Sequence, residues 1–383
     1  MNVQKGVFKN LYKNLITPVL KKDSGIDAEY LTNVSLSLLS FSSRKYNWPI
    51  VSSILKNLNE EFSVVDKRLT QNICGINFCN PIGLAAGFDK NGNAANIWKD
   101  FGFGFAELGT VTKFAQNGNP KPRLFRLAEE EAALNRMGFN NNGAENLVKN
   151  FVEQGIEFKK NRENICLGIN FGKSKITGLS QAKDDYLTSL KLLIPYCDYA
   201  AINVSSPNTE GLRSFHDQEE MKKLLSGVNK VIKEKKIDCP IVLKISPDIN
   251  DNEISKIVDL VRSHKIQGVV VSNTTDSNRD NLSDIKKHET GGLSGQPLKD
   301  ISTNLIKKFY KETKGKIKII GVGGVDSGKS AFEKITAGAD AIQLYTGMVY
   351  KGPGIVKEIK KELISILKKE NLKNISDAVG INA

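Results

Sequence analysis

The stretch NVSSPNTEG, from Asn203 to Gly211, places two serines, two asparagines and a threonine directly after the apolar run YAAINV. An apolar run of that length is typical of a buried strand. Hydroxyl and amide side chains both donate and accept hydrogen bonds, so together they suit a site that holds a polar ligand. The motif alone does not name the chemistry, because Ser206 could equally be a turn-forming hydroxyl ahead of Pro207.

Seven other apolar runs carry or precede residues of similar character. These are Asp89 and Lys90; Gly109 and Thr110; Asn170; Lys244; Ser272, Asn273, Thr274 and Thr275; the GVGG motif ending at Gly324; and Tyr345, Thr346 and Gly347. None of the three histidines, His216, His264 and His288, ends such a run, and no Asp, Glu or His cluster has metal-ligand spacing, so no metal is predicted. Amides, hydroxyls and two lysines provide little acid–base chemistry, which indicates a bound organic cofactor that brings its own reactivity.

Two of these features have more than one interpretation. The glycines of GVGG, followed by the helix-like SGKSAFEK, fit a phosphate site made of backbone N–H groups, which predicts a phosphate-bearing cofactor such as FMN. Alone, the same glycines fit a tight turn. Lys244 could form a Schiff base, as in a lyase, or could place positive charge beside an electron-rich ring. A phosphate-binding barrel without catalysis is the non-enzymatic alternative.

The elements that would position these residues alternate along the chain. Near-continuous apolar runs, typical of strands buried on both faces of a parallel sheet, occupy 81–87, 103–111, 165–171, 199–204, 240–246, 267–273, 317–324 and 341–347. Amphipathic stretches between or after them occupy 184–195, 217–235, 252–264, 300–313 and 328–337. This α/β pattern predicts a closed (β/α)8 TIM barrel over residues 61–383, with the site at the carboxyl ends of its strands. An open doubly wound sheet is the alternative, but no GxGxxG fingerprint follows the first run.

Two segments lie outside this alternation. FSVVDKRLTQNICGINFCNP, residues 62–81, has two β-prone pieces and could form a hairpin that plugs the bottom of the barrel. The connection 112–164 is far longer than an ordinary crossover and holds NPKPRLFRL and NRMGFNNNG. Long insertions at the top of a barrel are often lids or substrate loops.

The first 60 residues predict a separate extension of two helices. Residues 1–22 hold five lysines and no acidic residue, and their apolar residues recur at helical spacing; these are Val7, Phe8, Leu11, Tyr12, Leu15, Ile16, Val19 and Leu20. This favours a basic amphipathic helix on a membrane surface over a spanning helix or a signal peptide. The alternative is a helix docked on its own domain. A second helix, capped by Asp27, could cover an apolar pocket or tunnel.

Composition argues against several other classes. The net charge of +13 comes mostly from dispersed lysines without interleaved aromatic residues, so nucleic acid is not predicted as a partner. The five cysteines are scattered without a CxxC pair, which supports neither a zinc site nor a disulfide framework.

Six motifs, in their order and spacing, resemble the dihydroorotate dehydrogenase family over about residues 60 to 365: AAGFDKNG, NRMGFNN, NVSSPNTEGLR, SNTT, TGGLSGQPL and GVGGVDSG. Class 1 members, which are soluble and use fumarate or NAD, carry Cys before Pro-Asn. Ser206 fills that position here, as in the membrane-associated, quinone-reducing class 2. The N-terminal extension also fits class 2, in which two helices form the quinone tunnel. The resemblance therefore implies class 2, with a soluble class 1-like enzyme as the alternative.

The resemblance also implies a reaction and a role for each matching residue. Dihydroorotate would be oxidised to orotate in pyrimidine synthesis: Ser206 removes the C5 proton, Thr209 and a water near Phe139 relay it, and hydride from C6 passes to FMN. Substrate contacts would come from Lys90, Asn135, Arg136, Met137, Gly138, Phe139, Asn203, Asn208, Asn273 and Thr274. FMN contacts would come from Ala85, Ala86, Gly87, Phe88, Asp89, Thr110, Asn170, Asn203, Lys244, Ser272, Gly295, Gly324, Tyr345 and Thr346.

The quinone path and the location follow from the same resemblance. Arg126 and Tyr345 would lie where the tunnel reaches the flavin. The expected partners are dihydroorotate and orotate, a membrane quinone and a membrane surface, on the cytoplasmic side of a bacterial inner membrane. Two departures from the family pattern occur: Ser272 replaces a common Thr but keeps the hydroxyl, and DAEYL, residues 27–31, replaces a stretch that often carries Ala-His. The second departure concerns the quinone contacts and not the chemistry.

Overall fold

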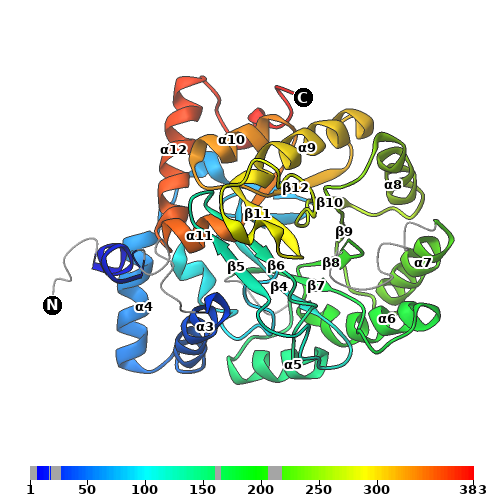
Figure 1. Ribbon diagram of the computed structural model, residues 1–383, viewed down its shortest axis with the longest axis horizontal. Helices are drawn as coiled ribbons and strands as arrows, with labels where there is room; N and C mark the ends of the chain where they lie inside the picture. Colours follow the sequence, from blue (N-terminus) through cyan, green and yellow to red (C-terminus); the bar gives the residue numbers. More distant parts are fainter. Residues whose placement is uncertain (1–6, 17, 19–26, 160–164, 206–217) are drawn as a thin grey trace.

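The computed structural model of this chain describes residues 7–16, 18, 27–159, 165–205 and 218–383. Eight parallel strands close into a barrel at the centre of the molecule (Figure 1). In chain order they are β3 (Ile82–Leu84), β4 (Phe105–Val111), β7 (Cys166–Phe171), β8 (Tyr199–Asn203), β9 (Ile241–Lys244), β10 (Gly268–Val271), β12 (Lys318–Val322) and β13 (Ala341–Leu344). The predicted TIM barrel is confirmed, and the open doubly wound alternative is wrong.

The strand sequences explain why the barrel closes. Strands β4, β8, β9, β10 and β13 are buried at every position, which requires a sheet covered on both faces. The last pairing joins β13 to β3 in parallel, with Ile342 opposite Ile82. Because this pairing leaves no free edge, every strand is fixed by two neighbours.

Helices surround the barrel (Figure 1). They are α5 (Ala144–Glu153), α6 (Ala182–Leu193), α7 (Gln218–Lys235), α8 (Asp251–Ser263), α9 (Lys299–Thr313), α10 (Gly328–Thr336), α11 (Thr346–Lys351) and α12 (Ile355–Lys369). Capping boxes begin α8 at Asn250 and α10 at Ser327. Each long helix buries one apolar stripe, as α8 does with Ile254, Ile257, Val258 and Val261.

The predicted hairpin closes the amino-terminal end of the barrel. Strands β1 (Gln71–Ile73) and β2 (Ile76–Phe78) pair antiparallel. Ile73 and Phe78 pack on an inward-facing layer of barrel side chains, which consists of Phe105, Tyr199, Ala201, Val242, Val270, Ile320 and Ala341. The ring centroid of Phe105 lies 5.1 Å from that of Phe78 and 6.2 Å from that of Tyr199.

The sequence patterns do not predict a three-stranded antiparallel sheet that the structure contains. It joins β5 (Leu124–Leu127) and β6 (Ala132–Asn135), both from the long connection 112–164, to β11 (Gly292–Gly295), which follows β10. A small apolar core of its own supports it. This sheet brings the NRMGFNN and TGGLSGQPL motifs together, although more than a hundred residues separate them in the chain.

The N-terminal segment forms α1 (Val7–Leu11), a π-helical turn (Tyr12–Ile16), α3 (Ala28–Arg44) and α4 (Pro49–Phe62) at one edge of the molecule (Figure 1). The Asp27 carboxylate accepts a hydrogen bond from the Tyr30 N–H at 2.8 Å and so caps α3, as predicted. The domain boundary at residue 60 stays a prediction. Among the described residues, no helix has both the length and the apolar content that crossing a membrane requires.

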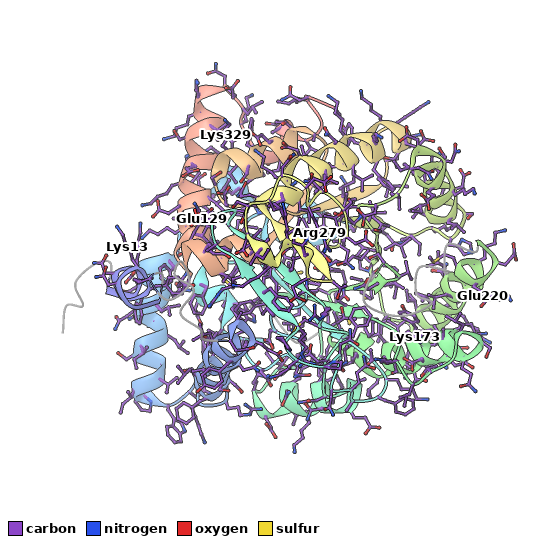
Figure 2. The ribbon with its side chains drawn as sticks, in the orientation of Figure 1. Lys13, Glu129, Lys173, Glu220, Arg279 and Lys329 are labelled. Carbon is purple, nitrogen blue, oxygen red and sulfur yellow. The ribbon has the colours of Figure 1, made fainter. Side chains whose placement is uncertain are left out.

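Charged side chains cover the outside of the molecule (Figure 2). Lys13, near the start of the chain, and Lys329 of α10 are both exposed. Charge spread in this way is typical of a solvated surface.

Truncating Phe105 tests the plug at the bottom of the barrel. We expect Phe105→Ala to lower the free energy of unfolding by ~3–5 kcal/mol, because the fully buried ring would leave a cavity between hairpin and barrel. Chemical denaturation with circular dichroism measures the loss. Val65→Ala is the control, since Val65 is 92% exposed and should change stability by less than ~0.5 kcal/mol. Equal effects of the two substitutions would contradict the packing role of the hairpin.

Candidate active site

A cavity of about 1180 Å³ lies at the carboxyl-terminal ends of the barrel strands. Most of the predicted site residues line it: Ala85, Ala86, Gly87, Lys90, Thr110, Asn135, Met137, Gly138, Phe139, Asn203, Lys244, Ser272, Asn273, Thr274, Gly295, Gly324, Tyr345 and Thr346. The small sheet contributes Asn135 and Gly295, which explains how segments outside the barrel reach the site. Ser206, Asn208 and Thr209 fall outside the described residues, so their roles stay predictions.

Hydrogen bonds fix the polar side chains at the strand ends relative to one another. The Thr110 hydroxyl donates to Asn170 Oδ1 at 2.6 Å, and Asn203 Nδ2 donates to the same oxygen at 3.2 Å. The Ser205 hydroxyl donates to Asn203 Oδ1 at 3.1 Å and accepts from Asn273 Nδ2 at 3.1 Å. The ends of β4, β7, β8 and β10 therefore share one network, which holds their amides in fixed orientations.

Asp89 and Arg136, two of the predicted contact residues, bond to protein groups instead of lining the cavity. Asp89 is fully buried, and its carboxylate accepts from the backbone N–H groups of Asn93 and Ala94 at 2.7 and 2.9 Å and from Trp98 Nε1 at 3.2 Å. Arg136 donates from Nη1 to Glu289 at 2.7 Å instead of lining the cavity. These two side chains support the loops that carry the site, and their direct contacts with ligands stay predictions.

The sequence analysis misses Glu107, a fully buried carboxylate in the middle of β4. It accepts hydrogen bonds from Asn170 Nδ2 at 2.8 Å, Tyr199 Oη at 2.9 Å and Gln343 Nε2 at 2.7 Å. Lys244 Nζ lies 3.8 Å from its Oε1. Burial, and then the nearby Glu107 carboxylate, raise the pKa of Tyr199 well above its usual value. The available signal was an acidic residue inside the apolar run FGFAELGTV, because a buried carboxylate requires partners.

Lys90 is half-buried in the cavity wall, and its Nζ donates to the carbonyl of Gly87 at 2.7 Å. Burial lowers the pKa of Lys90 to about 8, which the Glu29 carboxylate partly opposes. The ammonium is therefore available below about pH 8 for an anionic group in the cavity. Lys90 also lines a second, polar cavity beside α3, together with Asn91, Asn93 and Asn140.

Glycines form one wall of the cavity where larger residues would not fit. Gly295, Gly323 and Gly324 have positive φ angles of 93°, 121° and 67°. A Cβ added to Gly324 would lie 2.5 Å from the Cβ of Lys299. Their backbone N–H groups can approach an anion closely, and α10 begins just beyond them, so this wall fits a phosphate group.

One buried acceptor in the cavity lacks a partner. Gln343 lines the cavity, and its Oε1 makes no hydrogen bond within the part of the chain that the structure describes. A ring N–H of a bound ligand would satisfy it. The glycine wall, which fits a phosphate group, and this acceptor, which fits a ring N–H, together fit FMN.

A large apolar cavity, of about 1660 Å³, lies beneath the N-terminal helices. Its lining is mostly apolar and includes Leu31, Leu38 and Leu39 of α3 and Leu58 and Phe62 of α4; Arg126 is the charged side chain among its described lining residues. Four described residues line both this apolar cavity and the polar cavity at the strand ends: Leu124, Ala133, Tyr345 and Thr346. Tyr345 thus lines both cavities and Arg126 lines the apolar one, and their roles in a quinone path stay predictions.

A buried ion pair fixes the start of α3 close to that junction. Arg123 donates to Glu29 from Nη2 at 2.6 Å and from Nε at 2.9 Å, and both side chains are at most 7% exposed. Hydrogen bonds from Arg123 hold the pKa of Glu29 below its usual range. Glu29 belongs to the DAEYL segment, so an acidic side chain of that segment fixes the start of α3.

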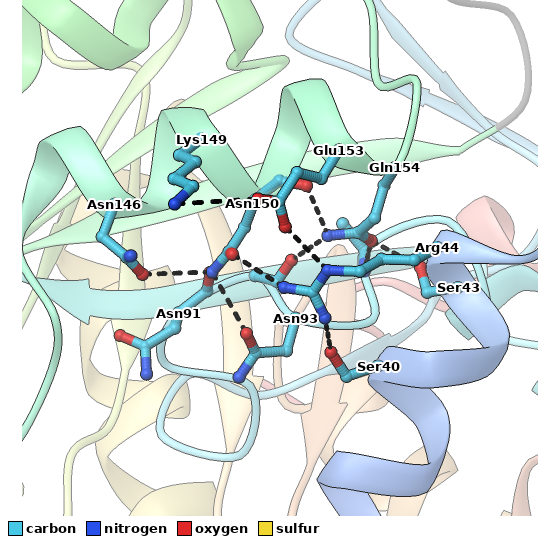
Figure 3. Close-up of polar contacts among 12 residues, drawn as sticks. Ser40, Ser43, Arg44, Asn91, Asn93, Asn146, Lys149, Asn150, Glu153 and Gln154 are labelled. Carbon is cyan, nitrogen blue, oxygen red and sulfur yellow. Dashed lines mark hydrogen bonds and ion pairs between the residues drawn. The ribbon is translucent and has the colours of Figure 1, made fainter.

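A polar network fixes the other end of α3 (Figure 3). Arg44 donates to Glu153 of α5 at 2.7 Å and to Asn150 at 3.0 Å, and it also contacts Ser40. The Ser43 hydroxyl donates to Gln154 at 2.5 Å. Both ends of α3 are thus attached to the barrel domain by buried or half-buried polar contacts.

The described residues include no group of three His, Cys, Asp or Glu side chains that could hold a metal ion.

Comparison with known proteins gives the family. The family model described as dihydroorotate dehydrogenase matches residues 68–367. Relatives named dihydroorotate dehydrogenase (quinone) from Trichodesmium erythraeum and Prochlorococcus marinus are 46% and 45% identical; the alignments cover 97% of this chain and 99% and 95% of the relatives.

Solved structures agree. The dihydroorotate dehydrogenase of Eimeria tenella in complex with ferulenol matches with a TM-score of 0.83 and 34% identity, over 93% of this chain and 96% of that chain. Its ligand-free form matches with a TM-score of 0.81 over 91% of this chain. The chain therefore belongs to the dihydroorotate dehydrogenase family, in its class 2 branch.

Proposed function

We propose that this chain oxidises dihydroorotate to orotate, with FMN as the hydride acceptor and a membrane quinone as the final electron acceptor. The observation that carries the proposal is the pair of adjoining cavities, one polar and one apolar, with a shared wall that includes Tyr345 and Thr346. A charged pyrimidine and a lipid-soluble oxidant need separate sites of these two kinds. The name of the relatives, which specifies a quinone, favours this function over the soluble class 1-like alternative.

The residues of the polar cavity match the groups on the substrate. Dihydroorotate has a carboxylate, for which the Lys90 ammonium is the partner, and two amide-like edges. Asn135, Asn203 and Asn273 line the same cavity and offer donors and acceptors together. Because hydrogen bonds already orient Asn203 and Asn273, they would bind the ring with little loss of side-chain freedom.

FMN, when bound, accepts the hydride from substrate C6 and delivers the electrons to the quinone. Gly295 and Gly324 would hold its phosphate through their backbone N–H groups. Lys244 would place a positive charge beside its ring, and Gln343 would accept from a ring N–H.

Ser206 would remove the C5 proton as the substrate is oxidised. A serine is a weak base, so hydrogen bonding and exclusion of water must activate it. The preceding residue, Ser205, is buried and bonded to Asn203 and Asn273 in the wall network, which supports a base at this strand end. Thr209 and Phe139 would guide the proton away; Phe139 lines the cavity.

Exposed apolar side chains on α3, on α4 and between them would contact the membrane from which the quinone enters. They are Tyr30, Val34, Leu38, Phe41, Trp48, Ile50 and Ile54. An apolar patch of this kind usually marks an interaction surface. In the N-terminal segment, Phe8 of α1 packs toward Phe62, and Tyr12 of the following turn donates to the carbonyl of Val349 at 2.5 Å. These two side chains fit the alternative in which this segment docks on its own domain. We therefore assign membrane contact mainly to α3 and α4, on the cytoplasmic side of a bacterial inner membrane.

Anaerobic mixing tests the reaction. Purified protein should be yellow, dihydroorotate should bleach the flavin absorbance, and a quinone should restore it. Ser206→Ala should keep its FMN but slow bleaching by at least ~10²-fold, because a general base contributes about that much.

Ser206→Cys is the matched control and should keep part of the rate, since a thiol can also act as the base. An unchanged bleaching rate in Ser206→Ala would refute the base assignment. Reoxidation by fumarate or NAD but by no quinone would refute the class 2 assignment.

Lys90 predicts a pH dependence of substrate binding. The pKa of Lys90 is lowered to about 8, so the protonated form that attracts the carboxylate is lost as pH rises through that value. The KM for dihydroorotate should therefore rise roughly tenfold per pH unit above about pH 8, with a smaller change in kcat. Lys90→Arg should flatten this rise, because a guanidinium stays charged. The same rise in the Arg variant would contradict the assignment.

Charges placed in the apolar patch should weaken membrane binding. Ile50→Glu combined with Ile54→Glu alters one face of α4, and vesicle binding should fall by at least ~10-fold, since each buried side chain of this size contributes ~1.5–3 kcal/mol. Bleaching by dihydroorotate should not change. Ile285→Glu, at a residue that is 78% exposed outside α3 and α4, is the control. Equal vesicle binding by the two variants would contradict the placement of the patch.

A further inference from the structure

The buried cluster beneath the polar cavity includes a carboxylate that has no assigned part in the reaction above. It contains Glu107, Asn170, Tyr199, Lys244 and Gln343, which come from five different barrel strands and are each at most 5% exposed. Glu107 is its centre, because three of the other side chains donate hydrogen bonds to the two carboxylate oxygens. Such a carboxylate, buried under a cofactor site and contacted from three strands, is costly to bury and calls for an explanation.

The cluster sets two opposite charges at two depths. Lys244 lines the cavity, whereas Glu107 lies beneath it and is absent from the lining. Their closest atoms, Nζ and Oε1, are 3.8 Å apart, which is too long for a strong hydrogen bond but close for two charges screened by little water. Tyr199 adds no charge, because its pKa is raised well above neutral pH. The cavity therefore faces the Lys244 ammonium, and the Glu107 carboxylate beneath it partly cancels the positive field of that ammonium.

We propose that Glu107 is a positioning residue that sets the reduction potential of the bound cofactor by opposing the charge of Lys244. The inference rests on the proposed function, in which FMN fills the cavity and Lys244 faces its ring. Positive charge beside that ring favours taking electrons from dihydroorotate and disfavours giving them to the quinone. Glu107 limits this bias, so neither half-reaction becomes strongly uphill.

The stoichiometry is unaffected. Each turnover moves two electrons and two protons from dihydroorotate to the quinone, which leaves as the quinol. The cofactor potential only divides the fixed driving force between the two half-reactions. A change at Glu107 should consequently affect the two halves in opposite directions, whereas loss of packing would impair both.

Glu107→Gln removes the charge and keeps the size of the side chain. We expect the midpoint potential of the bound flavin to become more positive, with at least a ~10-fold change in the equilibrium against a reference dye, which is about 30 mV for a two-electron couple. Bleaching by dihydroorotate should be as fast as in the unmodified enzyme or faster, and reoxidation by the quinone should be slower by roughly tenfold.

Two further variants complete the test. Lys244→Gln removes the positive charge that Glu107 opposes and should move the potential in the opposite direction. Tyr199→Phe removes one hydrogen bond to Glu107 without changing any charge, and its potential should stay close to that of the unmodified enzyme.

Unchanged potentials in Glu107→Gln or in Lys244→Gln would overturn the proposal, as would a shift of equal size in Tyr199→Phe. Loss of flavin or of the fold from both charge variants would also overturn it, because the cluster would then be a packing element. These outcomes differ from failure of the proposed function, in which the unmodified protein itself would show no flavin spectrum or no bleaching by dihydroorotate.

Discussion

Closure of the barrel is the constraint on which the rest of the structure depends. Once β13 pairs with β3, every inward-facing side chain must find its partners inside a space of fixed width. At the amino-terminal end the inward-facing side chains are apolar, and the β1–β2 hairpin covers the layer that they form. Above that layer the inward-facing side chains are polar, and Glu107 accepts hydrogen bonds from side chains of three strands. This rigid floor supports the polar cavity, whose Asn203 and Asn273 are oriented by hydrogen bonds to neighbouring strand ends.

The N-terminal helices depend on the barrel for their placement. Few strong contacts attach α3, and they lie at its two ends: Glu29 with Arg123, and Arg44 with Glu153 and Asn150. A buried ion pair contributes little net stability but strongly penalises any arrangement that separates the charges. The pair at Glu29 therefore specifies where α3 sits more than how stable it is. Between these attachments, the apolar face of α3 lines the apolar cavity beneath the N-terminal helices.

The sequence predicts the barrel well because its signal is local. Strands buried on both faces read as apolar runs, and all eight predicted runs contain a barrel strand. The small sheet was missed because β11 pairs with β6 across more than a hundred and fifty residues, and nothing in either short segment shows that pairing. Glu107 did leave a local signal, an acidic residue inside an apolar run, but the sequence does not show that its partners from β7, β8 and β13 meet it. Membrane contact was predicted for residues 1–22, whose apolar stripe is interleaved with lysines, because the sequence does not show how far side chains on α3 and α4 stay exposed after packing.

The shared wall between the two cavities separates two kinds of specificity. Because four of the described residues, Tyr345 and Thr346 among them, line both cavities, most substitutions elsewhere in their walls would affect one ligand without contacting the other. The pyrimidine side is built from strand ends that closure holds in place, whereas the oxidant side is built largely from helices attached at a few points. Substitutions in α3 and α4 can therefore adapt the enzyme to a different membrane or quinone while the oxidation of dihydroorotate stays unchanged.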